Sequence, residues 1–259
     1  MTGSDTNAQR IADLVTAYKI LLNENVLDSF GHVSARSAED PKRFLMPYAL
    51  PPSLVSEGDV LEYTIDDSQP VDARGRRVNG ERYLHGELYK ARPDVQAIVH
   101  SHSQAVLPLS IANVPLRPVI VQAGFLPPET PNFEIRDCRG NGRGMQITDI
   151  PRGAALAKTL GRNPVALLRG HGNVVVGMSI KQAVVYAVYV DINARMQMQA
   201  LALSPDIVIM DAPELFDPAE FDINRPWENY RQKLLDGEAR AGIDRGQFGL
   251  AHTQGRSAG

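Results

Sequence analysis

Residues 97–102 read Ala-Ile-Val-His-Ser-His, three apolar residues that lead into two histidines one residue apart. The apolar lead-in predicts a buried strand, and alternate side chains of a strand project from the same face. His100 and His102 can therefore direct both imidazoles toward one point. Pro93 ends a helix that we expect over 80–92, immediately before this strand. The stretch thus predicts a helix followed by a core strand, at whose end the imidazoles of His100 and His102 point the same way.

The segments on either side carry further helix and strand signals without regular βαβ repeats. Apolar residues at three- and four-residue steps predict a first helix from about Asp5 or Thr6 to Leu22. The other expected helices are a stretch that follows the 97–102 strand and runs through 110, then 149–160, which Gly161 ends, then 179–203 and about 227–235. The other expected strands are 44–46, 60–64, 165–168 and 173–176. This order predicts an α/β sandwich with a mixed or antiparallel sheet.

Composition bounds the class of protein. The chain has 259 residues and no linker rich in Pro, Gly or Ser, so we expect a single domain over 1–259. Its 27 basic and 30 acidic residues give a net charge of −3, which argues against a nucleic-acid partner. One cysteine, Cys138, excludes an intrachain disulfide and a multi-cysteine metal site, and we expect it to be inert. Residues 1–10 lack an apolar signal core and no window approaches the roughly 18 apolar residues of a membrane span, so we expect a cytoplasmic protein.

A third histidine, His171, lies between two glycines on a turn expected between two strands. Small neighbours leave its approach to an ion unobstructed. Three neutral imidazoles with an open position are the ligand set of a catalytic divalent-metal site. The other interpretation is a strand pair with one histidine satisfied by the backbone and one exposed. From the residues alone we favour a metal site at His100, His102 and His171.

Glu81 lies at the start of the helix that precedes the 97–102 strand. A carboxylate at a helix N-terminus is favoured by the helix dipole without any functional role. The functional interpretation is a fourth metal contact or a general acid/base, because a carboxylate near a metal can take and return a proton at carbon. His85, one turn later, is expected to pack or to support the site from behind.

These segments together resemble the class II aldolase/adducin family, over roughly residues 8–205. The resemblance is carried, in consistent order, by residues 31–36 (GHVSAR), 81–85 (ERYLH), 89–95 (YKARPDV), 97–102 (AIVHSH) and 168–172 (LRGHG). It implies a three-layer α/β/α sandwich around a mixed, largely antiparallel sheet, with 206–259 as a C-terminal extension. It also implies a homo-oligomer, with a tetramer favoured and sites at subunit interfaces.

The resemblance assigns roles to four residues. It implies that His100, His102 and His171 hold a divalent metal and that Glu81 is the acid/base, which can also touch the metal. Three histidines suit Zn²⁺, Mn²⁺, Fe²⁺ or Co²⁺, and the sequence does not choose among them.

The chain departs from the sugar-phosphate aldolases of the family where those enzymes hold the substrate phosphate. Gly31-His32 replaces an early Gly-Asn, Leu45-Met-Pro-Tyr48 replaces a Thr-Pro-Ser-Gly loop, and Asn79-Gly80 replaces a pair of serines. Too few donors remain for a dianionic phosphate. We expect apolar and aromatic walls instead, suited to a flat aromatic substrate and formed by Phe44, Leu45, Met46, Tyr48 and Leu50.

His32 and Tyr230 complete the candidate catalytic residues. His32 in a Gly-x-Val-Ser turn either caps backbone groups or acts as a donor to a substrate carboxylate or as a proton carrier. By resemblance, Tyr230 is a C-terminal tyrosine that reaches the site of a neighbouring subunit. Arg36 is expected to be structural, a solvated or salt-bridged charge at the edge of its strand.

With His32 in place of the asparagine, the chain resembles the branch that decarboxylates hydroxylated aromatic dicarboxylates such as dihydroxyphthalate or hydroxypyridine-dicarboxylate. This implies a metal-dependent, non-oxidative decarboxylase of a small aromatic carboxylate in aromatic catabolism. The first alternative is an aldolase acting on a non-phosphorylated hydroxy-acid or hydroxy-ketone. The second is a non-catalytic, adducin-like interaction module, which the retained histidines disfavour.

Overall fold

One mixed sheet organises the molecule in a computed structural model that describes residues 6–112, 114–216 and 221–249. Its seven strands are β1 (His32–Arg36), β2 (Arg43–Pro47), β3 (Val60–Thr64), β4 (Ala97–Ser101), β5 (Asn132–Phe133), β6 (Val165–Leu168) and β7 (Gly172–Gly177). Their order in space is β3-β2-β1-β4-β7-β6-β5, and every neighbouring pair is antiparallel except β5 and β6. The expected mixed, largely antiparallel sheet is confirmed.

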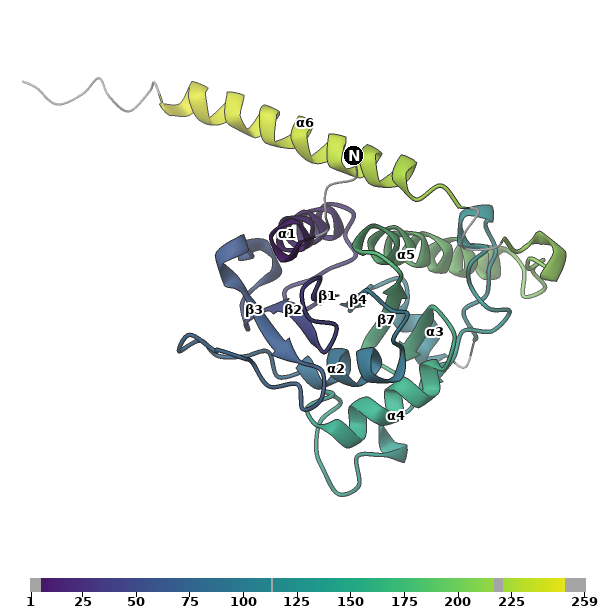
Figure 1. Cartoon of the computed structure of the whole chain (residues 1–259). Coiled ribbons are helices and arrows are strands. Elements are labelled where there is room, and N and C mark those ends of the chain that lie inside the picture. The colour runs from purple at the N-terminus through teal and green to yellow at the C-terminus, as the bar shows by residue number, and fades with distance from the viewer. Residues whose placement is uncertain (1–5, 113, 217–220, 250–259) are drawn as a thin grey trace, which may run out of the picture.

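Helices cover both faces of this sheet and make three layers (Figure 1). The helices are α1 (Asn7–Asn23), α2 (Arg82–Ala91), α3 (Leu107–Ile111), α4 (Ile150–Leu160), α5 (Ile180–Leu203) and α6 (Asn224–Gly249). Helices α1 and α5 lie on one face and α2 and α4 on the other, while α6 packs on the outer side of α1 and α5. No helix in the described ranges is long and apolar enough to cross a membrane.

Each sheet face has its own hydrophobic core because the central strands are apolar on both sides. In β4, Ala97 and Val99 pack in the core beneath α1 and α5, whereas Ile98 belongs to the core beneath α2 and α4. A strand buried on both faces has a continuous apolar sequence of this kind. The same alternation directs His100 toward the α2 and α4 face.

The expected helix starts are confirmed by their caps. The side chains of Thr6, Asp149 and Ser179 each accept a hydrogen bond from the backbone N–H three residues later, as N-cap residues do. Gly161 ends α4 with φ of +56°, a conformation that favours glycine.

Three elements differ from expectation. His32 lies in a strand, β1, and not in a turn. The two-residue strand β5 falls where no strand was expected, and its length is below what a pattern can reveal. Helix α6 extends well beyond the expected 227–235, because its polar second half carries no apolar periodicity by which to recognise it.

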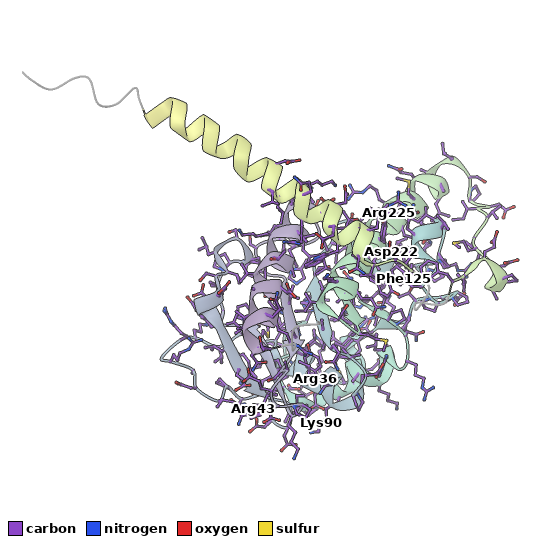
Figure 2. The ribbon with its side chains drawn as sticks, turned by 45° about the horizontal axis from the view of Figure 1, so that its top comes forward. Arg36, Arg43, Lys90, Phe125, Asp222 and Arg225 are labelled. Carbon is purple, nitrogen blue, oxygen red and sulfur yellow. The ribbon has the colours of Figure 1, made fainter. Side chains whose placement is uncertain are left out.

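Arg36 is buried, and in the described ranges it forms no salt bridge, so the expected solvated or salt-bridged charge is wrong. Its side chain is only 7 % exposed and donates hydrogen bonds to four backbone carbonyls, those of Val95, Pro41, Tyr89 and Arg92. The guanidinium also lies over the Tyr89 ring. It therefore joins β1 to α2 and to the loop that leads into β4. Figure 2 shows it near Lys90 of α2, away from α6.

We predict that Arg36→Met lowers the free energy of unfolding, measured in urea, by about 2–4 kcal/mol, because buried carbonyls lose a charged donor. Arg43→Met is the matched control on the neighbouring strand. Arg43 is partly exposed and pairs with Glu62 and Asp40, so its loss should cost far less. Equal losses from the two variants would contradict the structural role of Arg36.

Candidate active site

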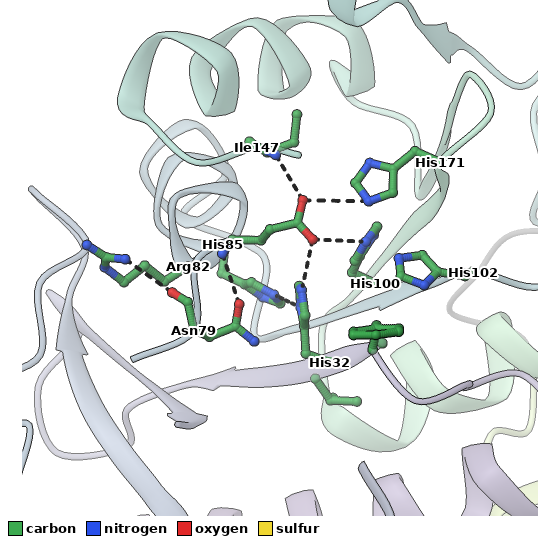
Figure 3. A network of polar contacts seen from close by, with 12 residues as sticks. His32, Asn79, Arg82, His85, His100, His102, Ile147 and His171 are labelled. Atoms are coloured by element: carbon green, nitrogen blue, oxygen red, sulfur yellow. Dashed lines mark hydrogen bonds and ion pairs between the residues drawn. The ribbon is translucent and has the colours of Figure 1, made fainter. Parts of the chain in front are cut away.

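Four elements bring the expected site residues together at one end of the central strands (Figure 3). His32 begins β1 and is the direct cross-strand partner of His100 in β4. Strand β4 also pairs with β7, which places the turn that carries His171 beside the end of β4. Glu81 is the residue that precedes the first turn of α2. Residues from across the sequence thus converge because adjacent strands end at the same edge of the sheet.

The Glu81 carboxylate lies at the centre of this cluster. Its Oε1 accepts a hydrogen bond of 2.8 Å from the Ile147 backbone N–H and lies 3.6 Å from His171 Nε2. Its Oε2 lies 3.7 Å from His32 Nε2 and 3.8 Å from His100 Nε2. Although burial would raise the pKa of Glu81, the facing His171 and His32 rings outweigh it, and the pKa lies well below its usual value. The carboxylate is therefore ionised.

The Nδ1 atoms of His100 and His102 have partners that orient both rings. His100 Nδ1 lies 3.0 Å from the carbonyl oxygen of Asn173, and His102 Nδ1 lies 3.1 Å from Asp28 Oδ2. Carbonyl and carboxylate oxygens only accept, so each Nδ1 carries a hydrogen, and Nε2 is the atom that presents a lone pair in the neutral ring. Such partners commonly fix metal-binding histidines in this tautomer.

The glycines around His171 permit a close approach of two backbones. A Cβ on Gly172 would lie 2.1 Å from the carbonyl oxygen of Ser101, so a side chain there would separate β7 from β4. Gly170 has φ of +63°, in the left-handed region that favours glycine. His171 therefore reaches the cluster because both of its neighbours are glycines.

The donor set fits a divalent metal ion. Ligand atoms from Glu81, His100, His102 and His171 all lie within 4.8 Å of one another. Within the described residues, the buried Nε2 atoms of His100 and His102 have no hydrogen-bond partner, which is unusual for buried polar atoms. Burial lowers the pKa of His100 well below its ordinary value, so that ring is in the neutral form that binds metals. The expected group of one carboxylate and three imidazoles thus has the composition and proximity of a metal site.

A family model described as Class II Aldolase and Adducin N-terminal domain matches residues 12–198. The chain belongs to this family. Decarboxylase tropJ of Talaromyces stipitatus is 34% identical to it over 214 residues, which cover 78% of this chain and 80% of that protein. The 3,4-dihydroxyphthalate decarboxylase of Arthrobacter keyseri is 27% identical over 236 residues, covering 86% and 93%.

The fold agrees with this membership. An aldolase II superfamily protein from Pseudomonas syringae has the same architecture, with a TM-score of 0.75, 20% identity and coverage of 91% of this chain and 96% of that one. The resemblance to the decarboxylase branch is confirmed by its similarity to the two decarboxylases. Decarboxylases and class II aldolases both cleave carbon–carbon bonds, and this class II aldolase family member is a lyase.

One expectation about the site of this class II aldolase family member is not supported. Phe44 and Met46 are fully buried in the core beneath α2, and Leu45 faces the opposite core, so these three residues of β2 do not form substrate walls. Strand pairing alternates the apolar side chains of β2 between two cores. Tyr230 is 5 % exposed and packs in the core on the α1 and α5 side of its own chain. Its expected contact with the site of a neighbouring subunit stays a prediction.

Some residues at the site were not recognised from sequence. Asp28 and Asn173 orient His102 and His100 through partners far away in the chain, and nothing in the sequence marks them. Ser34, in contrast, had a signal: polar and apolar residues alternate through 32–36, which predicts a strand with His32 and Ser34 on one face. Cys138 contributes nothing here, because burial raises the pKa of its thiol.

We predict that His100→Ala, His102→Ala and His171→Ala each abolish tightly bound divalent metal, because two histidines and a carboxylate leave a weak, misshapen site. The measurement is elemental analysis of the purified variants beside the wild-type protein, with turnover recorded in parallel. A variant with full metal content and full turnover would remove that histidine from the ligand set.

Proposed function

We propose that this chain is a metal-dependent, non-oxidative decarboxylase of a hydroxylated aromatic carboxylate. The observation that carries the proposal is the convergence of Glu81 and His171 with the Nε2 atoms of His100 and His102, which have no hydrogen-bond partner in the described part of the chain. Supporting it, tropJ and the Arthrobacter keyseri protein are both decarboxylases, and the second is named for a dihydroxyphthalate. The reaction fits aromatic catabolism in a cytoplasmic homo-oligomer, with a tetramer favoured.

His100, His102 and His171 would hold the metal, with Glu81 beside it. When bound, a divalent ion polarises an oxygen of the substrate and stabilises negative charge that develops there. A substrate hydroxyl next to the departing carboxylate suits this chemistry. In the ketone tautomer of the ring, that carboxylate lies β to a carbonyl group, as in a β-keto acid, and is lost easily. Zn²⁺, Mn²⁺, Fe²⁺ and Co²⁺ are all compatible with three imidazoles and one carboxylate.

Glu81 would carry the proton that replaces carbon dioxide on the ring. As an ionised carboxylate, it would first take the proton of the substrate hydroxyl and then deliver that proton to the ring carbon that bears the departing carboxylate. Departure of carbon dioxide from this ketone tautomer would leave a phenolate, which takes its proton from water. The carboxylate is buried, and the Ile147 N–H donates to Oε1 and fixes its orientation. Among the described residues, Oε2 has the imidazoles of His32 and His100 nearby, at 3.7 and 3.8 Å, and would be the oxygen that carries the proton.

An aldolase acting on a non-phosphorylated hydroxy-acid or hydroxy-ketone is the second candidate, because the same four residues would serve it. Both reactions cleave a bond next to an oxygen held by the metal and include protonation at carbon. They differ in the released fragment, which is carbon dioxide in one case and an aldehyde or pyruvate in the other. The non-catalytic alternative is disfavoured, since the four candidate metal-site residues lie together and the chain is a lyase.

Incubation of the metal-loaded protein with 3,4-dihydroxyphthalate, related hydroxyaromatic acids and a panel of aldols separates the candidates. We expect carbon dioxide and the corresponding phenol from at least one aromatic acid, and no such release after removal of metal with a chelator. Release of an aldehyde or pyruvate without carbon dioxide would overturn the decarboxylase in favour of the aldolase.

We predict that Glu81→Gln retains bound metal but lowers turnover by roughly 10²–10⁴, the usual contribution of a positioned proton carrier. The amide oxygen can still accept from the Ile147 N–H, so the local fold should persist. The measurements are metal content and the rate of carbon dioxide release.

Glu87→Gln is the matched control, since Glu87 is a buried carboxylate on the same helix that faces Lys90 and not the site. Its turnover should stay within a few-fold of the wild type. Loss of metal in Glu81→Gln would make Glu81 chiefly a ligand, and near-normal turnover would show that another group delivers the proton.

A further inference from the structure

A buried row of polar side chains runs from His32 into the protein, away from the metal ligands. His32 Nδ1 lies 2.7 Å from His85 Nε2, and His85 Nδ1 lies 2.6 Å from Ser34 Oγ. Ser34 Oγ in turn lies 2.9 Å from the Tyr89 hydroxyl. All four side chains are buried, and His85 and Ser34 are fully so. Figure 3 shows the start of the row, with His85 behind His32.

The row follows from the packing of α2 on β1. His32 and Ser34 are two residues apart on a strand, so they share a face. His85 and Tyr89 are four residues apart on α2, so they also share a face, and Glu81 lies one turn earlier. The two-residue spacing of the strand and the one-turn spacing of the helix match over this short contact. His32 therefore meets His85, and Ser34 meets both His85 and Tyr89.

The hydrogens of this row can be placed from one end. Burial raises the pKa of the Tyr89 hydroxyl, so it keeps its hydrogen. Ser34 Oγ is its hydrogen-bond partner within the described part of the chain, so Tyr89 donates to Ser34. Ser34 then has its own hydrogen for His85 Nδ1. If Ser34 donated to Tyr89, the Tyr89 hydrogen would have no acceptor among the described residues, and if Ser34 accepted from both neighbours, its own hydrogen would have none. Either arrangement would cost about 1–3 kcal/mol.

The order of donors fixes both rings. A ring nitrogen that accepts a hydrogen bond carries no hydrogen of its own, and an imidazole in water or protein keeps at least one. Because His85 Nδ1 accepts from Ser34, its hydrogen is on Nε2 and is donated to His32 Nδ1. The hydrogen of His32 is therefore on Nε2, the atom that points to the site and lies 3.7 Å from Glu81 Oε2.

His32 is thus the opposite tautomer of its neighbours. His100 and His102 carry their hydrogens on Nδ1, where oxygen acceptors hold them, and present Nε2 lone pairs. His32 presents an N–H in the same direction. The difference comes from the partner behind each ring and not from the imidazole itself.

We propose that His85 is a positioning residue which, backed by Ser34 and Tyr89, holds His32 as a neutral Nε2–H hydrogen-bond donor to an oxygen of the substrate. The expected effect of His85 on the rate of decarboxylation rests on the proposed function, whereas the tautomer of His32 does not depend on it. The assignment makes His32 a donor that orients the substrate, and it excludes His32 as a fourth imidazole ligand or as a base.

Nitrogen NMR of the ¹⁵N-histidine-labelled protein, with and without Zn²⁺, tests the tautomer directly. We expect the Nε2 of His32 to have the shift and directly bonded hydrogen of a pyrrole-type nitrogen, and its Nδ1 the shift of an unprotonated, pyridine-type nitrogen. His32→Gln identifies the signals by their loss. A hydrogen on Nδ1 of His32, alone or together with one on Nε2, would overturn the proposal.

Two variants of His85 separate positioning from packing. His85→Leu fills the space without a donor, while His85→Gln keeps an N–H for His32 and an oxygen for Ser34. We expect His85→Leu to lower kcat/KM for decarboxylation by about 10- to 100-fold, as for loss of one hydrogen bond to a charged group, with metal content unchanged. His85→Gln should recover most of this loss and the Nε2–H signal of His32.

Equal losses in the two variants, with the His32 tautomer unchanged, would reduce His85 to a packing residue and overturn the proposal. If no acid releases carbon dioxide, the proposed function fails, yet the wild-type tautomer and its loss in His85→Leu still decide this inference. If His85→Leu does not fold, the spectra of the wild-type protein and of His85→Gln still decide the tautomer of His32.

Discussion

An ionised carboxylate buried among imidazoles is the constraint on which the site depends. Glu81 is only 7 % exposed, and a charge removed from water to this degree needs compensating partners. One backbone N–H and the rings of His32, His100 and His171 surround it, all but the first at more than 3.5 Å. This spacing is too long for full hydrogen bonding and leaves room between the carboxylate and the rings. A bound cation would complete the compensation that the protein groups begin.

The contact between α2 and β1 holds this arrangement in place. Glu81, His85 and Tyr89 recur at one-turn steps on the helix and meet alternate residues of the strand. Arg36, the last residue of β1, closes the contact by donating to the carbonyls of Tyr89 and Arg92 at the other end of α2. A shift of the helix along the strand would therefore break the Arg36 hydrogen bonds and displace Glu81 together. The structural group Arg36 and the candidate site residue Glu81 thus depend on the same contact between α2 and β1.

The sequence predicted the parts of this site that follow from local periodicity. The i, i+2 spacing of His100 and His102, the glycines around His171 and the helix start at Glu81 all correspond to features of the structure. The parts it did not reveal depend on pairing between distant segments. Nothing near His102 specifies Asp28, and the apolar run in β2 indicates burial without showing that two cores, and no substrate, cover it. Tyr230 is assigned by resemblance alone, and its burial in the core of its own chain leaves that assignment a prediction.

The buried row behind His32 also bears on which group moves the proton. If His32 gave its Nε2 hydrogen to the substrate, an imidazolate would remain unless His85 passed its own hydrogen forward. That transfer would draw successively on Ser34 and Tyr89 and would end in a buried phenolate, which burial of Tyr89 strongly disfavours. His32 is therefore well placed to hold a substrate oxygen and poorly placed to donate a proton to carbon. Glu81 has no such chain behind it: its Oε1 is held by one backbone amide, and its Oε2 faces the site. His32 and Glu81 differ because His32 is hydrogen-bonded to the buried row of His85, Ser34 and Tyr89, whereas Glu81 is not part of that row.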